Sequence, residues 1–265
     1  MQGLRLLCLV ICMFGSAAAS AARPAIAIII DDLGNRASDK QVIQLPGAIT
    51  CAFLPHTPYT PELARLAHQH NKQVMLHVPM QSMHVHELGP GSLTLDMNET
   101  EIARTLQRNL AAVPHVQGVN NHMGSLLTQH PGHMLWLMQA MNKHGDLFFV
   151  DSRTTAETVA KMVADENQIP NLSRDVFLDA QDSVAFVESQ FKLLIRKARK
   201  NGTAVGIAHP YPNTMKVLRQ RLAQLEELDI DLISVSDVIK RQQEGKQTWQ
   251  LSLSHLPRAA KNSKQ

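Results

Sequence analysis

The chain has 265 residues, of which 44% are hydrophobic and 4% aromatic, and its net charge is +3 at pH 7. This length is sufficient to bury one sizeable core and does not require a second domain. The small net charge gives no electrostatic surface for nucleic acid and therefore argues against a nucleic-acid partner.

Residues 1–22 have the features of an export signal peptide. Arg5 and the amino terminus supply positive charge, the apolar stretch LLCLVICMF follows, and small residues then offer cleavage sites after Ala19 or Ala22. The small residues favour cleavage over the alternative, an uncleaved signal anchor. The apolar stretch is too short to span a bilayer as a mature helix, so no stable membrane insertion is predicted after cleavage. We therefore expect a periplasmic or otherwise exported protein. Its mature chain retains only Cys51, so no internal disulfide is expected.

The apolar run over residues 25–30 predicts a buried parallel strand that ends at two adjacent carboxylates, Asp31 and Asp32. Two neighbouring carboxylates at a strand end repel each other and lose solvation, so they need a cation, a shared proton or strong hydrogen-bond donors. The alternative is a solvated turn in which both side chains face water. This segment alone leaves both interpretations open.

Strand and helix patterns then alternate along the chain. Thr60, Asn98 and Asp182 are predicted N-caps of helices, and Gly145 is a predicted C-cap. Further strands are predicted over residues 49–54, 74–76, 116–119, 147–150, 176–178, 203–208 and 232–235. This alternation predicts an α/β domain over residues 23–240 with a parallel sheet, and seven or eight strands favour a distorted barrel over an open sheet. Residues 81–97 are expected to form a long loop over the site, and residues 241–265 a disordered, polar and basic tail.

Metal-binding or acid–base side chains stand at or just after five of the predicted strand ends. They are Asp31 with Asp32, His77, His122, Asp151 and His209. Because the carboxyl ends of parallel strands share one face, we expect these side chains to form one site. An aspartate with two histidines suits zinc with open positions for water and substrate. A second carboxylate and a further histidine could then transfer protons, which is the arrangement of a hydrolase.

Five strings of residues, in the order IIIDDLG, LHVPM, NNHMGS, FFVDSRT and AHPY, resemble the motifs of the polysaccharide deacetylase (NodB-like) family. More specifically, they resemble the divergent polysaccharide deacetylase subfamily of exported bacterial proteins. The resemblance covers roughly residues 24–240. It implies a NodB-like distorted (β/α) barrel of about seven strands and a metal-dependent carbohydrate deacetylase.

The resemblance also implies a set of metal ligands. Asp32 matches the metal-binding aspartate of the family, and His77 matches the first of two histidines that are separated by three residues. Gln81 stands where the family has the second histidine, so we infer that His122 supplies the missing ligand from a different strand. The alternative for His77 and His122 is hydrogen bonding to backbone carbonyls without a metal.

The catalytic residues follow from the same resemblance. Asp31 matches the catalytic base and His209 the general acid, while Asp151 and Arg153 match a motif that orients the base and lines the site. Structural alternatives remain open for three of them. Asp31 could cap a turn, His209 could order the loop before Pro210, and Arg153 could be only an ion-pair partner of Asp151.

The leading hypothesis is a zinc-dependent deacetylase that acts on an envelope polysaccharide such as peptidoglycan. A catalytically impaired protein of the same fold, which binds envelope glycan or a protein partner, is the alternative. The replacement at Gln81 and the low aromatic content favour this alternative. A hydrolase of phosphoesters or amides shares the ligand set and ranks last, because the chain lacks an evident phosphate-binding glycine loop. The sequence identifies no protein partner.

Overall fold

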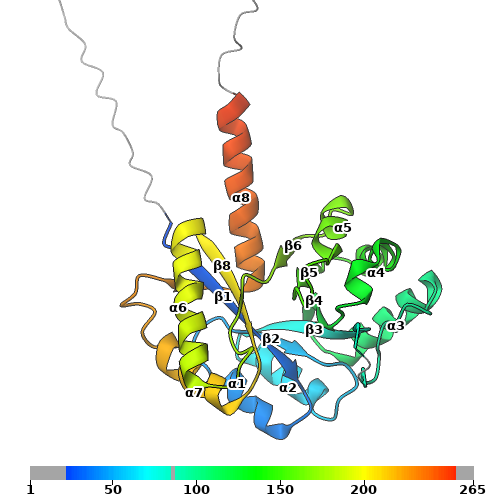
Figure 1. Ribbon diagram of the computed structural model, residues 1–265, viewed down its shortest axis with the longest axis horizontal. Coiled ribbons are helices and arrows are strands. Elements are labelled where there is room, and N and C mark those ends of the chain that lie inside the picture. The colour runs from blue at the N-terminus through cyan, green and yellow to red at the C-terminus, as the bar shows by residue number, and fades with distance from the viewer. Residues whose placement is uncertain (1–21, 85–86, 255–265) are drawn as a thin grey trace, which may run out of the picture.

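Parallel strands make up the whole sheet in the computed structural model, which describes residues 22–84 and 87–254. The nine described strands are β1 (Ala25–Leu33), β2 (Thr50–Phe53), β3 (Gln73–Met80), β4 (Val116–Met123), β5 (Phe148–Asp151), β6 (Asn171–Ser173), β7 (Val176–Phe177), β8 (Thr203–Ala208) and β9 (Asp231–Leu232). Their order is β6-β5-β4-β3-β2-β1-β8-β7, and β9 pairs with β1. The sheet curls into a half-barrel between the edge strands β6 and β7 (Figure 1). The predicted distorted barrel is therefore confirmed.

Helices cover the outside of this curled sheet (Figure 1). Their bounds are α1 (Lys40–Ile43), α2 (Thr60–Gln69), α3 (Glu99–Ala112), α4 (Pro131–His144), α5 (Ala160–Glu166), α6 (Val184–Asn201), α7 (Pro212–Leu222) and α8 (Val235–Ser254). The predicted capping box at Asn98 and the C-cap at Gly145 are confirmed. Tyr59 and Ser183, rather than Thr60 and Asp182, occupy the other two N-cap positions.

The structure has one strand more than the eight predicted segments, because β6 has no counterpart among them. β6 has three residues, and β7 and β9 have two each. Pro170 precedes β6 directly, and this proline conceals the strand in the sequence pattern. The other two short strands overlap the predicted segments 176–178 and 232–235, although the second is shifted and Val235 begins α8 instead.

Helix α8 replaces much of the predicted disordered tail. It begins at Val235 and continues to Ser254, while residues 255–265 lie outside the described part of the chain. Its first turn is anchored because the Gln73 side-chain oxygen accepts a hydrogen bond from the Val235 backbone N–H at 2.9 Å. Val238 and Ile239 pack into the sheet interior, and the helix then projects from the body of the protein (Figure 1). No described helix has the combined length and apolar character that crossing a bilayer requires.

The side chains of each strand alternate between two hydrophobic clusters. On β1, Ile26, Ile28 and Ile30 pack under the outer helices, whereas Ala27 and Ile29 point into the curl of the sheet. Every residue of β1 except Asp32 is buried, as expected for a parallel strand covered on two sides. This alternation decides which residues at each strand end point into the interior.

Gly118 provides a test of packing inside the curl. A Cβ atom added at this position would lie 2.2 Å from the ring of buried Phe148. We expect Gly118→Ala to lower the free energy of unfolding by about 1–3 kcal/mol, because the ring must move within a packed core. Urea unfolding measures the change. Gly132→Ala is the matched control, since its added Cβ meets nothing within 4 Å; equal stability of the two variants would contradict the interior packing described above.

Candidate active site

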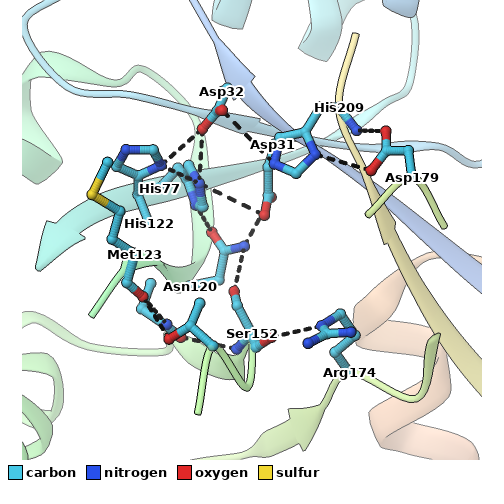
Figure 2. A network of polar contacts seen from close by, with 12 residues as sticks. Asp31, Asp32, His77, Asn120, His122, Met123, Ser152, Arg174, Asp179 and His209 are labelled. Carbon is cyan, nitrogen blue, oxygen red and sulfur yellow. Dashed lines mark hydrogen bonds and ion pairs between the residues drawn. The ribbon is translucent and has the colours of Figure 1, made fainter. Parts of the chain in front are cut away.

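Polar side chains from four strands meet inside the curl at its carboxyl end (Figure 2). On each strand they occupy the alternate positions that face the interior, two residues after an apolar side chain of the inner cluster. Asp31 lies two residues after Ile29, His77 two residues after Met75, and His209 two residues after Ile207. On β4, Val119 belongs to the outer cluster, so the alternate residues Asn120 and His122 share the interior face. The predicted strand-end residues Asp31, Asp32, His77, His122 and His209 therefore lie together.

Asp32 joins its neighbour Asp31 in the pocket because the end of β1 is irregular. Successive residues of a regular strand point to opposite faces, so only one of the two carboxylates would normally face the interior. The register with β2 shifts between Ile30 and Leu33, and Asp32 has a φ of 61°. Aspartate tolerates this left-handed conformation better than most residues. The bulge thus brings both carboxylates to one site.

Asp32, His77 and His122 form a triad that is suited to a metal ion. The Asp32 Oδ1 atom lies 3.2 Å from His77 Nε2 and 2.9 Å from His122 Nδ1, and the two nitrogens are 3.2 Å apart. Ligand atoms around tetrahedral zinc are separated by about 3.3 Å, given its usual bond lengths. Apart from these two ring nitrogens, the buried Asp32 Oδ1 atom has no hydrogen-bond partner among the described residues. These three atoms therefore have the spacing of one face of a metal coordination tetrahedron.

Asn120 fixes the tautomer of His77. Its amide nitrogen donates to Asp31 Oδ1 at 2.9 Å, so its oxygen faces His77 Nδ1 at 2.8 Å. In the neutral ring the Nδ1 proton must then be donated to Asn120, which leaves the Nε2 lone pair directed at the triad. Metal-binding histidines are usually held in this way by a partner on the second ring nitrogen.

The charges around the triad favour a cation in the pocket. Burial opposes ionisation of Asp32, but hydrogen bonds and charge from His122 and His77 hold its pKa well below the usual range. Burial likewise opposes protonation of His77, yet Asp31 and Asp32 raise its pKa. The two carboxylates thus attract positive charge to this position, either as a proton on His77 or as a metal ion between the three side chains.

Asp31 lies beside the triad as a buried carboxylate. Burial raises its pKa, while His77 and His209 act in the opposite direction. Asn120 occupies Asp31 Oδ1, whereas Asp31 Oδ2 lies 3.6 Å from His77 Nε2. A raised pKa and an oxygen that faces the triad are properties of a general base at this position.

His209 approaches the opposite side of Asp32 and is held by a residue that sequence reasoning missed. Its Nδ1 atom lies 3.0 Å from Asp179 Oδ1, and its backbone N–H donates to Asp179 Oδ2 at 2.6 Å. Burial opposes protonation of the ring, but Asp179 and the neighbouring carboxylates raise the pKa of His209 to about 9. The ring can therefore carry a proton on Nε2, which lies 3.7 Å from Asp32 Oδ2. Asp179 could have been found from the sequence, because it directly follows the predicted strand 176–178.

Asp151 and Arg153 do not reach Asp31 as the resemblance implied. Asp151 accepts hydrogen bonds from the Arg153 backbone N–H at 2.8 Å and from Thr158 at 3.1 Å, and the Arg153 side chain is exposed. The reason is that side chains alternate along β5: Val150 points into the curl, so the side chain of the next residue, Asp151, points outward. Among the described residues, the hydrogen bond to the Asp31 carboxylate comes from Asn120.

Ser152, rather than its neighbours, connects this strand to the site (Figure 2). Its hydroxyl lies 3.4 Å from the Asn120 amide nitrogen, and its carbonyl accepts from Arg174 Nε at 2.6 Å. Arg174 also lies over the ring of Phe177. No sequence pattern identifies Arg174, because it lies between the two short strands β6 and β7.

Gln81 has a structural role in place of metal binding. Its side-chain oxygen accepts a hydrogen bond from the Leu95 backbone N–H at 2.8 Å, and its backbone bonds to Leu93 and Leu126. These contacts fasten the segment after β3 to the rest of the loop. The missing histidine of the family motif has therefore become a loop anchor, while His122 on β4 lies within the triad.

Comparisons with known proteins agree with this fold. The family model for divergent polysaccharide deacetylases matches residues 28–239. The chain is 36% identical over 219 residues to the uncharacterized protein YibQ of Escherichia coli (strain K12), covering 82% of this chain and 68% of that protein. It is 37% identical over 221 residues to an uncharacterized protein of Haemophilus influenzae, covering 83% of this chain and 78% of that protein.

A solved structure has a similar fold. It is the crystal structure of the uncharacterized protein ATU2773 from Agrobacterium tumefaciens C58, with a TM-score of 0.79 and 21% sequence identity. The match covers 83% of this chain and 91% of that one. With a family match across most of the curled sheet and relatives at more than one-third identity, the resemblance inferred from the motifs is confirmed, and the chain belongs to the divergent polysaccharide deacetylase family.

Proposed function

We propose that this protein is a metal-dependent carbohydrate deacetylase that hydrolyses N- or O-acetyl groups on an envelope polysaccharide such as peptidoglycan. The observation that carries the proposal is the triad of ligand atoms spaced 2.9–3.2 Å apart beside one buried carboxylate and one aspartate-bound histidine. Family membership supports the carbohydrate substrate, and the expected export signal supports a location outside the cytoplasm.

Asp32, His77 and His122 would hold the divalent cation, for which their one oxygen and two nitrogens favour zinc. When bound, such a cation supplies Lewis-acid polarisation of the acetyl carbonyl and lowers the pKa of a water molecule. His122 and Asp32 are partly exposed, whereas His77 is buried, so the site opens to solvent on the side of the first two residues. This opening gives an acetyl group access to the triad.

Asp31 would accept the proton of the attacking water through Oδ2. Asn120 holds Oδ1 and so fixes the orientation of the carboxylate. The water oxygen then forms a bond to the acetyl carbon. Since burial raises the pKa of Asp31, the carboxylate is a stronger base than an exposed aspartate.

His209 would complete the reaction by donating its Nε2 proton to the leaving nitrogen or oxygen of the sugar. The bond between that atom and the acetyl carbon breaks, and acetate and the free amine or hydroxyl are the products. Asp179 holds the opposite ring nitrogen, and Thr214 donates to the same carboxylate at 2.8 Å. Asp179 therefore positions the proton donor without touching the substrate.

Removal of two ligands tests the metal site. We expect wild-type protein to retain about one zinc ion per chain, as implied by a single three-ligand site, and an Asp32→Ala/His122→Ala double variant to lose it. Elemental analysis after zinc loading and gel filtration measures the ratio. His68→Ala, which removes an exposed histidine outside the triad, is the control. Equal zinc content in the double variant and in wild type would contradict the site.

Asp31→Asn separates metal binding from catalysis. The substitution keeps the shape of the side chain and removes the proton acceptor, so we expect zinc content to remain and acetate release to fall by roughly 10²–10⁴-fold. Acetate release from acetylated glycans measures the effect. A zinc-loaded wild type that releases no acetate from a broad panel of glycans would instead favour the glycan-binding function without turnover.

Asp179→Asn tests the proton donor. Loss of the carboxylate weakens the hold on His209, so we expect kcat for a sugar acetamide to fall on the order of 10- to 100-fold with little change in KM. Hydrolysis of 4-nitrophenyl acetate should fall much less, because 4-nitrophenolate leaves without protonation. An equal loss on both substrates would indicate a structural role for Asp179 and contradict the assignment.

A further inference from the structure

A row of rings lines one side of the site. The Arg174 guanidinium lies 4.8 Å from the centre of the Phe177 ring, which meets His209 edge-on at 5.6 Å. His209 in turn stacks with Tyr211, with ring centres 5.2 Å apart and planes inclined by 23°. These contacts form a continuous wall that begins beside Ser152 and ends at Tyr211, with the candidate proton donor within it.

Tyr211 is the solvent-facing end of this wall. Its side chain lies among the exposed large hydrophobic residues, with 41% of the residue exposed, whereas the large aromatic residues Phe53, Phe149 and Phe191 are fully buried. One face of the ring is covered by His209. The remaining surface is an aromatic platform open to solvent at the edge of the site.

The backbone holds this platform in place. Tyr211 stands between Pro210 and Pro212, and it is the N-cap residue of α7 with an extended conformation (φ −72°, ψ 147°). Proline restricts both its own φ and the conformation of the residue before it. The position of Tyr211 is thus fixed before a ligand arrives, which reduces the entropy lost on binding.

An aromatic ring with a polar hydroxyl suits a sugar, whose ring presents C–H groups on its faces and hydroxyls at its edge. Tyr211 contacts the proton donor His209 and does not belong to the triad. A sugar ring on its exposed surface would therefore lie next to His209 and beside a sugar whose acetyl group entered the triad. Occupation of both positions would need two linked sugar units.

We propose that Tyr211 binds the sugar unit next to the one that is deacetylated, and that this contact determines how strongly the protein prefers linked sugars over a single sugar. This inference rests on the proposed deacetylase function. It identifies a specificity-determining residue on the β8–α7 connection, outside the metal ligands and the proton-transfer groups.

The test compares acetate release from N-acetylglucosamine and from its β-1,4-linked tetramer. We expect wild type and Tyr211→Phe, which keeps the ring, to prefer the tetramer in kcat/KM. In Tyr211→Ala this preference should fall by about tenfold, the factor that corresponds to one well-formed aromatic stacking contact. Hydrolysis of 4-nitrophenyl acetate, which needs neither a neighbouring sugar nor a protonated leaving group, is measured on all three proteins to correct the comparison for any change in the triad and its proton acceptor.

An unchanged preference for the tetramer in Tyr211→Ala would overturn the inference while leaving the deacetylase function standing. Failure of wild type to release acetate from either sugar would instead count against the deacetylase function. In that case calorimetric binding of the tetramer decides the role of Tyr211. Binding weakened about tenfold in Tyr211→Ala and kept in Tyr211→Phe supports the sugar position, and equal or absent binding overturns it.

Discussion

The bulge at the end of β1 is the constraint on which the candidate site depends. Without the left-handed turn at Asp32, strand alternation would direct this side chain towards the outer helices, in line with Ile30. A carboxylate in that apolar layer would carry a large desolvation cost and no partner. The bulge instead places two carboxylates around two histidines, and Asn120 joins the base side of the pocket to the ligand side through a single amide.

Much of the fold follows from the sequence because its strands are long apolar runs and its helices have clear caps. The same patterns locate Asp31, Asp32, His77, His122 and His209 at strand ends, although only the bulge, which the sequence pattern does not show, turns Asp32 inward. The alternation of side chains along each strand explains where the structure differs from the predicted set of site residues. A strand end alone does not decide which face a residue occupies, so the sequence pattern selects Asp151, whose side chain bonds to Thr158, and passes over Asp179, which holds His209. The positions of Asn120 and Arg174 depend on side-chain contacts between strands, which a single sequence does not encode locally.

The proton-transfer groups differ in how they are supported. The Asp31 carboxylate accepts a hydrogen bond from Asn120 on β4. His209 follows β8, and its ring is bound by Asp179, which follows the neighbouring strand β7. The two groups thus belong to separate hydrogen-bond networks on either side of Asp32. This separation allows one carboxylate to favour its proton-accepting role while another keeps a neighbouring imidazole protonated.

The substitution at Gln81 has a consequence for how this architecture can diversify. In the family pattern, two ligands on one short segment tie the loop after β3 to the metal. Here the ligand atoms come from three strands, β1, β3 and β4, and Gln81 serves the loop alone. An ion at this position would cross-link the rim of the sheet and stabilise the native state by mass action. The loop after β3 then has no part in holding such an ion, so a change in its length would leave the geometry of the triad in place.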